Sequence, residues 1–288
     1  MYSNKLFTPL RYPGGKGRFA PYIADIMRAN GLEGGHYFEP YAGGAGVALE
    51  LLYDGVVTDI HINDADPALH DFWMVATRQT DALIRLVQDE PVTMDAWHHW
   101  RSVLFGETKA SLLHRGFATL FMNRTNRSGI LKAGVIGGKA QSGIYRLDAR
   151  YKRDVLVGRL ELLKQHSTAI NVYGEDALAL LARCKDFLPS RSLIYLDPPY
   201  YLKGQGLYRN FYEHDDHLAI SRLLQRSKFP RRWVVSYDDA PEIRAMYSGV
   251  QGMGYGLRYT ARRRYIGSEV MFFSPKLTDI PDELPVAA

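Results

Sequence analysis

Strand-like segments alternate with helix-like segments along most of this chain, and this alternation restricts the possible fold more than any other feature. Short apolar runs read as strands in HYFEP, VVTDIHIN, INVY, SLIYL and RRWVVSY, and helical spacing of apolar residues follows most of them. Such a pattern favours an α/β fold with a doubly wound, mostly parallel sheet. The sequence LRYTARRRYIGSEVMFFS predicts two further antiparallel strands, a C-terminal hairpin that closes the sheet.

A segment of helices and loops interrupts the alternation between residues 73 and 160. Helical patterns occupy much of it, whereas residues 128–151 are basic, glycine-rich and irregular, which indicates surface loops. We therefore predict one α/β domain built from residues 1–72 and 161–288. Residues 73–160 would be a second domain inserted into the first.

Charge is distributed unevenly along the chain, whose formal net charge is +5. Residues 53–100 carry nine acids and two arginines, whereas residues 101–160 carry twelve lysines and arginines and only three acids, a local net charge of +9. A concentrated basic segment indicates a polyanionic partner. A solvated charged surface is the alternative explanation.

Composition adds limits on the compartment. The chain has one cysteine, Cys184, so it forms no internal disulfide and fits a reducing environment. No stretch is long and apolar enough to span a bilayer or to act as a secretion signal. We expect a cytoplasmic protein without a membrane partner.

A glycine-rich turn follows the first predicted strand, in FEPYAGGAGVALELL. Gly43, Gly44 and Gly46 allow a ligand to approach the backbone and the helix N-terminus, although glycines at turns also have purely structural roles. Asp64 ends the next predicted strand, roughly 20 residues on, where a carboxylate can accept hydrogen bonds from ribose hydroxyls. Together these features favour a ligand that contains adenosine.

Two other segments have both a functional and a structural interpretation. In RYPGGKGRFAPYI, Tyr12 and Lys16 suit stacking on a ligand and binding a carboxylate, or they belong to a tight turn with a solvated lysine. Asp176 lies at another strand-to-helix corner and suits either an exocyclic amine or the N-cap of the helix. The sequence leaves both choices open.

The stretch LIYLDPPYYLKG gives the most specific signal. Its apolar start predicts a buried strand that ends at Asp197, because Pro198 and Pro199 have no N–H to donate to a strand ladder. The Asp197 carboxylate and the Pro198 carbonyl then form two neighbouring acceptors beside the ring of Tyr200. Hydrogen bonds from both hydrogens of an aromatic amine would favour a pyramidal nitrogen, whose lone pair becomes available for attack.

These motifs together resemble the D12-class DNA adenine N6-methyltransferases, the group that includes the methylases acting on GATC. The matching segments are RYPGGK, FEPYAGGAGVAL, INDAD, MNRTNRSGI, GED, LDPPY, VVSYDD and RRRYIGSEVMFF, in the family's order. The resemblance implies a Rossmann-like methyltransferase fold, S-adenosylmethionine as methyl donor, and adenine in double-stranded DNA as substrate. No metal is expected.

By position, the resemblance assigns residues 1–72 and 161–288 to cofactor binding and catalysis. Lys16 would bind the carboxylate of the cofactor, Asp64 its ribose and Asp176 its adenine amine. The expected catalytic residues are Asp197, Pro198, Pro199 and Tyr200. The expected cofactor contacts are Tyr12, Lys16, Glu39, Gly43, Gly46, Asp64, Asp176 and Asp197.

The resemblance also implies that the target adenine is flipped out of the duplex and that residues 73–160 bind the DNA. The expected DNA contacts are Arg124, Arg127, Ser128, Lys132, Lys139, Arg146 and, in the C-terminal hairpin, Arg263. Members that act on GATC usually carry an aromatic residue and an asparagine where this chain has Arg127 and Ser128. The side chain that fills the base gap and the target sequence therefore do not follow from the family.

Other functions stay open at this point. One is methylation of RNA or of cytosine N4, although Asp197 in place of a serine disfavours cytosine. Another is a non-catalytic DNA-binding subunit, which predicts loss of pocket residues that are all present here. We expect a monomer, with a restriction or other defence system as a possible functional partner.

Overall fold

The computed structural model describes residues 6–12, 15–202, 212–259 and 265–282. The chain divides into two compact units. The first consists of Met1–Leu6, Lys16–Ala65 and Tyr173–Ala288, and the second of Phe7–Gly15 and Asp66–Val172. The second unit extends beyond the predicted insertion of residues 73–160 at both ends, and it also includes a short N-terminal segment.

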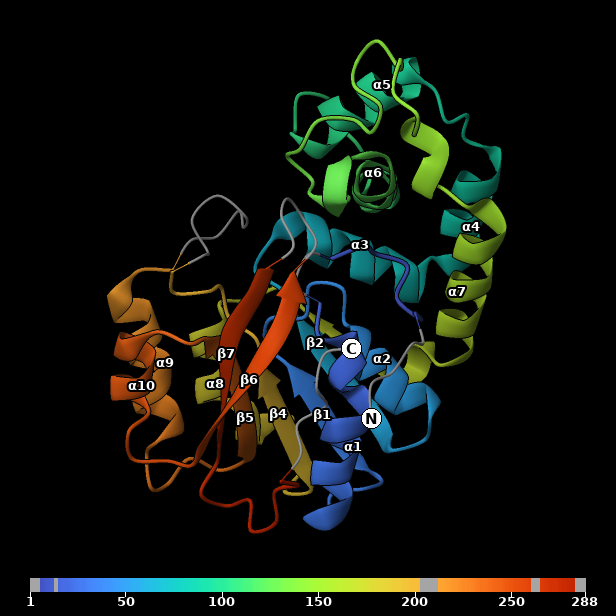
Figure 1. Ribbon diagram of the computed structural model, residues 1–288. Coiled ribbons are helices and arrows are strands. Elements are labelled where there is room, and N and C mark those ends of the chain that lie inside the picture. Colours follow the sequence, from blue (N-terminus) through green and yellow to red (C-terminus); the bar gives the residue numbers. More distant parts are fainter. Residues whose placement is uncertain (1–5, 13–14, 203–211, 260–264, 283–288) are drawn as a thin grey trace. The chain divides into compact units, whose positions relative to one another are not determined.

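Seven strands form one mixed sheet. They are β1 (Gly35–Glu39), β2 (Val57–Asn63), β3 (Ile170–Tyr173), β4 (Ser192–Leu196), β5 (Arg232–Asp238), β6 (Gly252–Tyr259) and β7 (Tyr265–Phe273). Their order is β3-β2-β1-β4-β5-β7-β6 (Figure 1). β1 is parallel to β2 and β4, β4 is parallel to β5, and β7 is antiparallel to β5 and β6. The predicted doubly wound sheet with its C-terminal antiparallel hairpin is thus confirmed.

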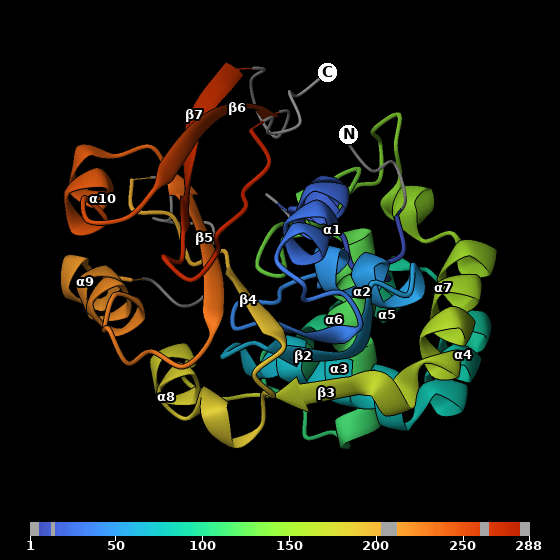
Figure 2. The same cartoon turned by 90° about the horizontal axis from the view of Figure 1, so that it is seen from below.

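Helices of the first unit cover both faces of this sheet. They are α1 (Ala20–Ala29), α2 (Gly46–Tyr53), α8 (Ala177–Ala182), α9 (His214–Leu224) and α10 (Pro241–Met246), with short 3-10 turns at Gly17–Phe19 and Cys184–Asp186. In two perpendicular views α8, α9 and α10 lie on one face, and α1 and α2 on the other (Figures 1 and 2). This layering leaves the carboxyl ends of the parallel strands as the edge where a ligand can bind.

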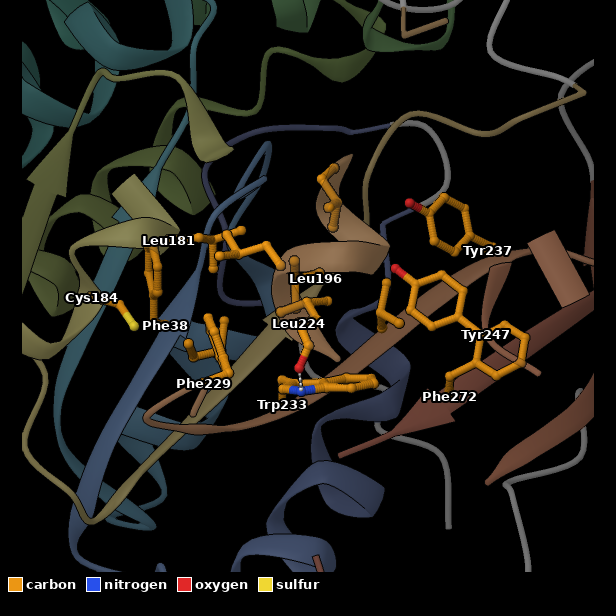
Figure 3. Packing of buried hydrophobic residues seen from close by; sticks show 14 of the residues in the cluster. Phe38, Leu181, Cys184, Leu196, Leu224, Phe229, Trp233, Tyr237, Tyr247 and Phe272 are labelled. Carbon is orange, nitrogen blue, oxygen red and sulfur yellow. Dashed lines mark hydrogen bonds between the residues drawn. The ribbon is translucent and has the colours of Figure 1, made fainter. Parts of the chain in front are cut away.

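A cluster of buried side chains joins the sheet to α8, α9 and α10. Phe38 and Ile194 from the central strands contribute to it, together with Leu181 from α8. Trp233, at the start of β5, packs in the same cluster and donates its indole N–H to the carbonyl of Leu224 at 3.0 Å (Figure 3). Because the only polar atom of this large ring is satisfied, its burial contributes its full apolar area to stability.

The second unit is helical. It contains α3 (Pro67–Arg78), α4 (Thr80–Asp89), α5 (Met94–Leu104), α6 (Leu112–Thr125) and α7 (Arg153–Gln165), with 3-10 turns at Arg127–Gly129, Leu147–Arg150 and Ser167–Ala169. Asp66 caps α3 by accepting the N–H of Ala68 at 3.0 Å. A Cβ atom on Gly116 would lie 2.8 Å from the side chain of Val75, so this glycine permits the close approach of α6 to α3. Residues 128–151 form loops and short turns, as predicted.

Candidate active site at the carboxyl ends of the strands

Four acidic residues lie at the carboxyl ends of the parallel strands. Glu39 is the last residue of β1 and Asp238 the last of β5, while Asp64 and Asp197 directly follow β2 and β4. β1 has β2 on one side and β4 on the other, so the chain reverses its direction of winding between β1 and β4. In doubly wound sheets, ligands bind at such a switch point, beyond the carboxyl ends of the strands.

Asp197 stands at this switch point with one carboxylate oxygen already engaged. Its Oδ1 accepts a hydrogen bond from Ser236 Oγ at 2.8 Å and lies 3.3 Å from Lys16 Nζ. Among the residues that the structure describes, none donates a hydrogen bond to Oδ2. The Asp197 side chain is 23% exposed, so it is accessible in part. Pro198 is buried and Pro199 is half-buried.

Lys16 and Tyr200 belong to a buried polar network next to Asp197. Lys16 Nζ donates to the Tyr200 hydroxyl at 2.6 Å and lies 3.2 Å from a carboxylate oxygen of Glu269. Tyr200 donates in turn to Glu269 Oε1 at 2.5 Å, and Tyr255 donates to Glu269 Oε2 at 2.6 Å. Three expected site residues therefore meet, and they share two partners, Tyr255 in β6 and Glu269 in β7, that the sequence motifs did not indicate.

Burial raises the pKa values of Asp197 and Tyr200. It raises the pKa of Asp197, with a further increase from the Glu269 carboxylate, whereas Lys16 and Ser236 act in the opposite direction. Burial also raises the pKa of Tyr200 well above its ordinary value, and the Asp197 and Glu269 carboxylates add to the effect. Tyr200 is therefore a phenol that donates its proton, and Asp197 is a stronger base than a solvated aspartate.

Glu39 holds the glycine turn from beneath. Its Oε1 accepts the N–H of Ala48, in the first turn of α2, at 3.1 Å and the hydroxyl of Tyr37 at 3.0 Å. Burial raises the pKa of Glu39 to about 8, while these two hydrogen bonds lower it. Packing also favours a glycine at position 46, because a Cβ atom there would lie 3.2 Å from the Cα of Gly17.

Asp64 is hydrogen-bonded to the glycine turn that follows β1. Asp64 Oδ2 accepts the N–H of Gly43, which has a φ of +47°, at 3.0 Å. The preceding residue, Asn63, is buried and donates to the carbonyls of Pro40 at 2.9 Å and Glu175 at 3.0 Å. Asn63 therefore ties the loops after β1, β2 and β3 together, a structural function that its place in the INDAD motif does not reveal.

Asp176 caps α8, since its Oδ1 accepts the N–H of Ala179 at 2.9 Å. The side chain is exposed, so the capping interaction leaves it accessible to a ligand. A pair of tyrosines lies nearby: the hydroxyls of Tyr41 and Tyr212 are 3.1 Å apart. Burial raises the pKa of Tyr212, and the Asp176, Asp216 and Asp64 carboxylates add to the increase. The sequence motifs did not indicate the pair, because in FEPYAGGAGVAL only Glu39 and the glycines were expected to have a role, and Tyr212 lies outside the motifs.

Tyr12 belongs to the second unit, where its carbonyl accepts the N–H of Gly15 at 3.2 Å. Its expected contact with a cofactor stays a prediction.

The expected DNA contacts differ in exposure. Arg127, Ser128, Lys132, Lys139 and Arg146 are exposed, and Ser128 has a φ of +57°. The same loop region exposes Ile144, at 98%, and Tyr145. Arg263 lies outside the described residues.

The structure does not support the expected contact of Arg124 with DNA. It is only 7% exposed and its guanidinium donates through two nitrogens to the carbonyl of Pro9, one of them at 2.7 Å. Burial lowers its pKa to about 9, with smaller effects from Arg159 and Arg11. A guanidinium held in this way ties the N-terminal segment to α6 and is not available to a DNA phosphate.

The asparagines of the MNRTNRSGI motif are likewise internal. Asn123 Oδ1 accepts the N–H of Arg11 at 2.7 Å, and its Nδ2 donates to the carbonyls of Arg11 and Gly129 at 2.9 and 2.8 Å. Asn126 accepts the indole N–H of Trp97 at 2.8 Å and donates to the Leu131 carbonyl at 2.9 Å. Both residues shape the basic loop from inside the unit.

Comparison with known proteins gives a family. The sequence profile described as "D12 class N6 adenine-specific DNA methyltransferase" matches residues 12–261. No protein with a curated description matches the chain. Among solved structures, a Pyrococcus horikoshii protein described as a "putative RNA methyltransferase" is similar, with 11% sequence identity and a TM-score of 0.42. The similarity covers 95% of this chain and 91% of that one.

Proposed function

The chain belongs to the D12 class N6 adenine-specific DNA methyltransferases, and from this membership we propose that it transfers a methyl group from S-adenosylmethionine to the N6 amine of an adenine in double-stranded DNA. The observation that carries the proposal is the state of Asp197. Its Oδ1 is held by Ser236 and Lys16, none of the described residues donates a hydrogen bond to its Oδ2, and the side chain is partly exposed.

Asp197 would act on the target amine in two ways. The lone pair of an exocyclic adenine amine is delocalised into the ring, which makes the nitrogen a weak nucleophile. A hydrogen bond from the amine to Oδ2 favours a pyramidal nitrogen and localises the lone pair. After transfer the nitrogen has one proton too many, and Oδ2 can receive it before it passes to water. The raised pKa of Asp197 makes this carboxylate a better proton acceptor near neutral pH.

Tyr200 and Pro198 would complete the pocket. Tyr200 is fixed through its hydroxyl by Lys16 and Glu269, so its ring has one orientation when a base arrives. Tyr200 is only 5% exposed, so stacking on a base would require its neighbours to move, but the ring itself would lose little side-chain entropy. Pro198 would contribute its carbonyl as the second acceptor for the amine.

The residues around the switch point fit an adenosine-containing cofactor. Asp64 is half-buried and already oriented by Gly43 N–H, which suits it to ribose hydroxyls, and the exposed Asp176 suits an adenine amine. The turn held by Glu39 lets a ligand approach the backbone at Gly43 and Gly46, and Lys16 would hold the methionine end. When bound, S-adenosylmethionine supplies a methyl group that its sulfonium has already activated.

We further propose that the first unit binds the cofactor and carries the catalytic residues, while the basic loops of the second unit bind the DNA. Exposed arginine and lysine side chains would contact phosphates and base edges as the target base leaves the stack. No described helix is long and apolar enough to cross a membrane. The cytoplasmic location, the monomeric state and the link to a defence system stay predictions.

The test is transfer of isotope-labelled methyl groups by the purified protein to duplex DNA, single-stranded DNA and RNA of matched sequence. We expect label in the duplex as N6-methyladenine after digestion to nucleosides. Label in RNA alone would replace DNA by RNA as the substrate. No transfer to any polymer, together with no binding of S-adenosylmethionine, would support the non-catalytic alternative. Asp64→Ala should weaken cofactor binding in calorimetry, with Asp54→Ala, at the C-terminal end of α2, as the control.

A further inference from the structure

Two histidines and a tyrosine form a hydrogen-bonded row across β1, β2 and the end of β3. His36 Nδ1 lies 3.0 Å from His61 Nε2, and His61 Nδ1 lies 3.0 Å from the Tyr173 hydroxyl. The rings are stacked, with centroids 5.2 Å apart for the two histidines and 6.0 Å apart for His61 and Tyr173. The other nitrogen of His36, Nε2, lies 3.4 Å from Asp59 Oδ2. The proposed methyl transfer uses none of these side chains.

The row connects a partly exposed end to the loop that follows β3. His36 is the second residue of β1, and its side chain is 26% exposed. His61 is buried, with the ring of Phe187 packed 5.4 Å from its own. Tyr173 is the last residue of β3 and precedes the segment that contains Glu175 and Asp176. A proton from water therefore reaches His36 more readily than His61.

In its neutral form the row has two possible directions, because each neutral imidazole has one N–H and one bare nitrogen. The Asp59 carboxylate favours a hydrogen on His36 Nε2, so His36 Nδ1 is the bare nitrogen. His61 then donates through Nε2 to His36 and accepts the hydroxyl hydrogen of Tyr173 at Nδ1. The opposite direction would place a nitrogen lone pair of His36 against the carboxylate.

Protonation of His36 makes this direction impossible. A charged imidazole has a hydrogen on both nitrogens, so His61 Nε2 must then be the acceptor. His61 moves its single hydrogen to Nδ1 and donates to the Tyr173 oxygen, and the hydroxyl hydrogen of Tyr173 turns away. The row gains one proton in total, at His36. His61 does not take it, because burial lowers the pKa of His61 to about 4, with a further decrease from His36 and an opposite effect of Asp59.

We propose that His36, His61 and Tyr173 form a pH-sensitive switch, in which protonation of His36 reverses both hydrogen bonds of the row and redirects the hydroxyl hydrogen of Tyr173. A carboxylate is available near that hydroxyl. Burial raises the pKa of Tyr173, and Glu175 adds to the increase, while Arg183 acts in the opposite direction. The redirected hydrogen therefore competes with Arg183, which donates to the same Glu175 carboxylate. The switch thus passes a change of pH at β1 to the loop that carries Asp176.

The remaining charged groups around the row lie at its two ends. At the His36 end, the carbonyl of Arg191 accepts the N–H of His36 at 3.0 Å. The guanidinium of Arg191 lies close to Gly34, since a Cβ atom there would be 3.2 Å from Nη2. In the described part of the chain, Asp59 is the carboxylate that forms an ion-pair contact with His36. The Glu175–Arg183 ion pair lies at the Tyr173 end.

The experiment observes the ring nitrogens directly. Protein labelled with ¹⁵N-histidine is examined by long-range ¹H–¹⁵N NMR, which distinguishes a bare nitrogen from an N–H, and His36→Gln and His61→Gln assign the signals. At about pH 8 we expect both rings to carry their hydrogen on Nε2. At about pH 5 we expect His36 to carry two hydrogens and His61 to be neutral, with its hydrogen on Nδ1.

Two variants test the ends of the row. Asp59→Asn removes the carboxylate that sets the direction, so His36 should populate both neutral forms at about pH 8. Tyr173→Phe removes the last hydrogen bond, so the backbone amide signals of Glu175 and Asp176 should no longer change together with the His36 signals, as we expect them to do in the wild type. Asp25→Asn, on the exposed side of α1, should alter neither result.

The inference is overturned if His61 keeps its hydrogen on Nε2 at about pH 5, or if it becomes doubly protonated together with His36. A wild-type protein with the His61 hydrogen on Nδ1 at about pH 8 would overturn it as well. These spectra of the wild type decide the question even if a variant does not fold, and they do not depend on the proposed methyl transfer.

Discussion

Ser236 donates its hydroxyl hydrogen to Asp197 Oδ1 at 2.8 Å, across the pair of strands β4 and β5. The contact fixes the rotation of the carboxylate about its own bond, since Oδ1 is also the atom close to Lys16. Oδ2 is consequently the oxygen to which none of the described residues donates a hydrogen bond. The catalytic geometry thus depends on a serine two residues before the end of the neighbouring strand.

Ser236→Ala should lower the rate of methyl transfer and leave DNA affinity nearly unchanged. A hydrogen bond to a charged group is worth roughly 1.5–3 kcal/mol, so we expect kcat to fall about tenfold or more. The Ser236 hydroxyl also lies 3.0 Å from the hydroxyl of Tyr195, so Tyr195→Phe is the control for general disturbance of this region. Equal losses in the two variants would assign Ser236 a role in packing only.

Asp238 fixes the chain directly after the catalytic motif. Its two oxygens accept the N–H groups of Tyr201 and Leu202, each at 2.8 Å, and the side chain is buried. Asp238→Asn places an amide N–H₂ opposite one of these donors, and we expect the free energy of unfolding to drop by about 1–3 kcal/mol together with the rate.

The control for this prediction is the neighbouring Asp239, which forms a partly exposed ion pair with Arg244. Asp239→Asn should cost less than about 1 kcal/mol in urea denaturation, because such pairs contribute little. If Asp238→Asn had no larger effect than Asp239→Asn, the two backbone hydrogen bonds would not be what holds this segment.

The raised pKa of Glu39 should make the stability of the protein depend on pH. Its pKa is raised by burial from 4.5 to about 8 in the folded protein, so between these values the folded state holds a proton that the unfolded state has lost. The stability that this proton gives is complete below about pH 4.5 and is lost as the pH rises through about 8. Glu39→Gln should flatten the fall in unfolding free energy over this range, measured by urea denaturation at several pH values, whereas the exposed Glu33→Gln should keep it.

Substitutions of Lys139 and Arg127 in the basic loop should affect DNA binding in two different ways. Lys139→Ala should weaken binding to all duplexes alike and reduce the slope of log affinity against log salt by about one unit, as expected for a phosphate contact. Arg127→Ala should relax the choice of target sequence in methylome sequencing if this exposed guanidinium reads bases. Lys185→Ala, on the exposed surface of the first unit, is the matched control and should change neither quantity.

Arg124→Met tests the correction to the predicted DNA contacts. Because the Arg124 guanidinium donates to the Pro9 carbonyl inside the second unit, its loss should lower the melting temperature and leave the salt slope unchanged. A reduced salt slope with unchanged stability would return Arg124 to the DNA-binding surface.

Much of the fold could be predicted because its signals are local. Apolar runs that stop at Asp64 and Asp197 identify strand ends, and two prolines fix the second end without any tertiary information. Parallel strands then bring these ends to one edge of the sheet. The short helix after Asp176 was likewise predictable, since an acid at a strand-to-helix corner is a common cap.

The remainder depends on contacts between distant parts of the chain. Lys16 meets Glu269 across almost the whole sequence, and nothing in the local pattern around either residue indicates the pair. Arg124 was misassigned for the same reason: a basic residue among basic residues looks exposed, and only the fold shows that a carbonyl from the N-terminal segment takes up its guanidinium.

The most direct test of the central claim is single-turnover methyl transfer to duplex DNA by the Asp197→Asn variant, compared with the wild-type protein and with Asp25→Asn on the exposed side of α1. The product is measured as N6-methyladenine by mass spectrometry, and DNA binding is measured in parallel. We predict that Asp197→Asn lowers the rate by at least about 10²-fold with DNA affinity retained, because an amide can neither hold the amine as strongly nor take up its proton. Asp25→Asn should match the wild type. Transfer by Asp197→Asn at a near wild-type rate would contradict the assignment of Asp197 to the target amine.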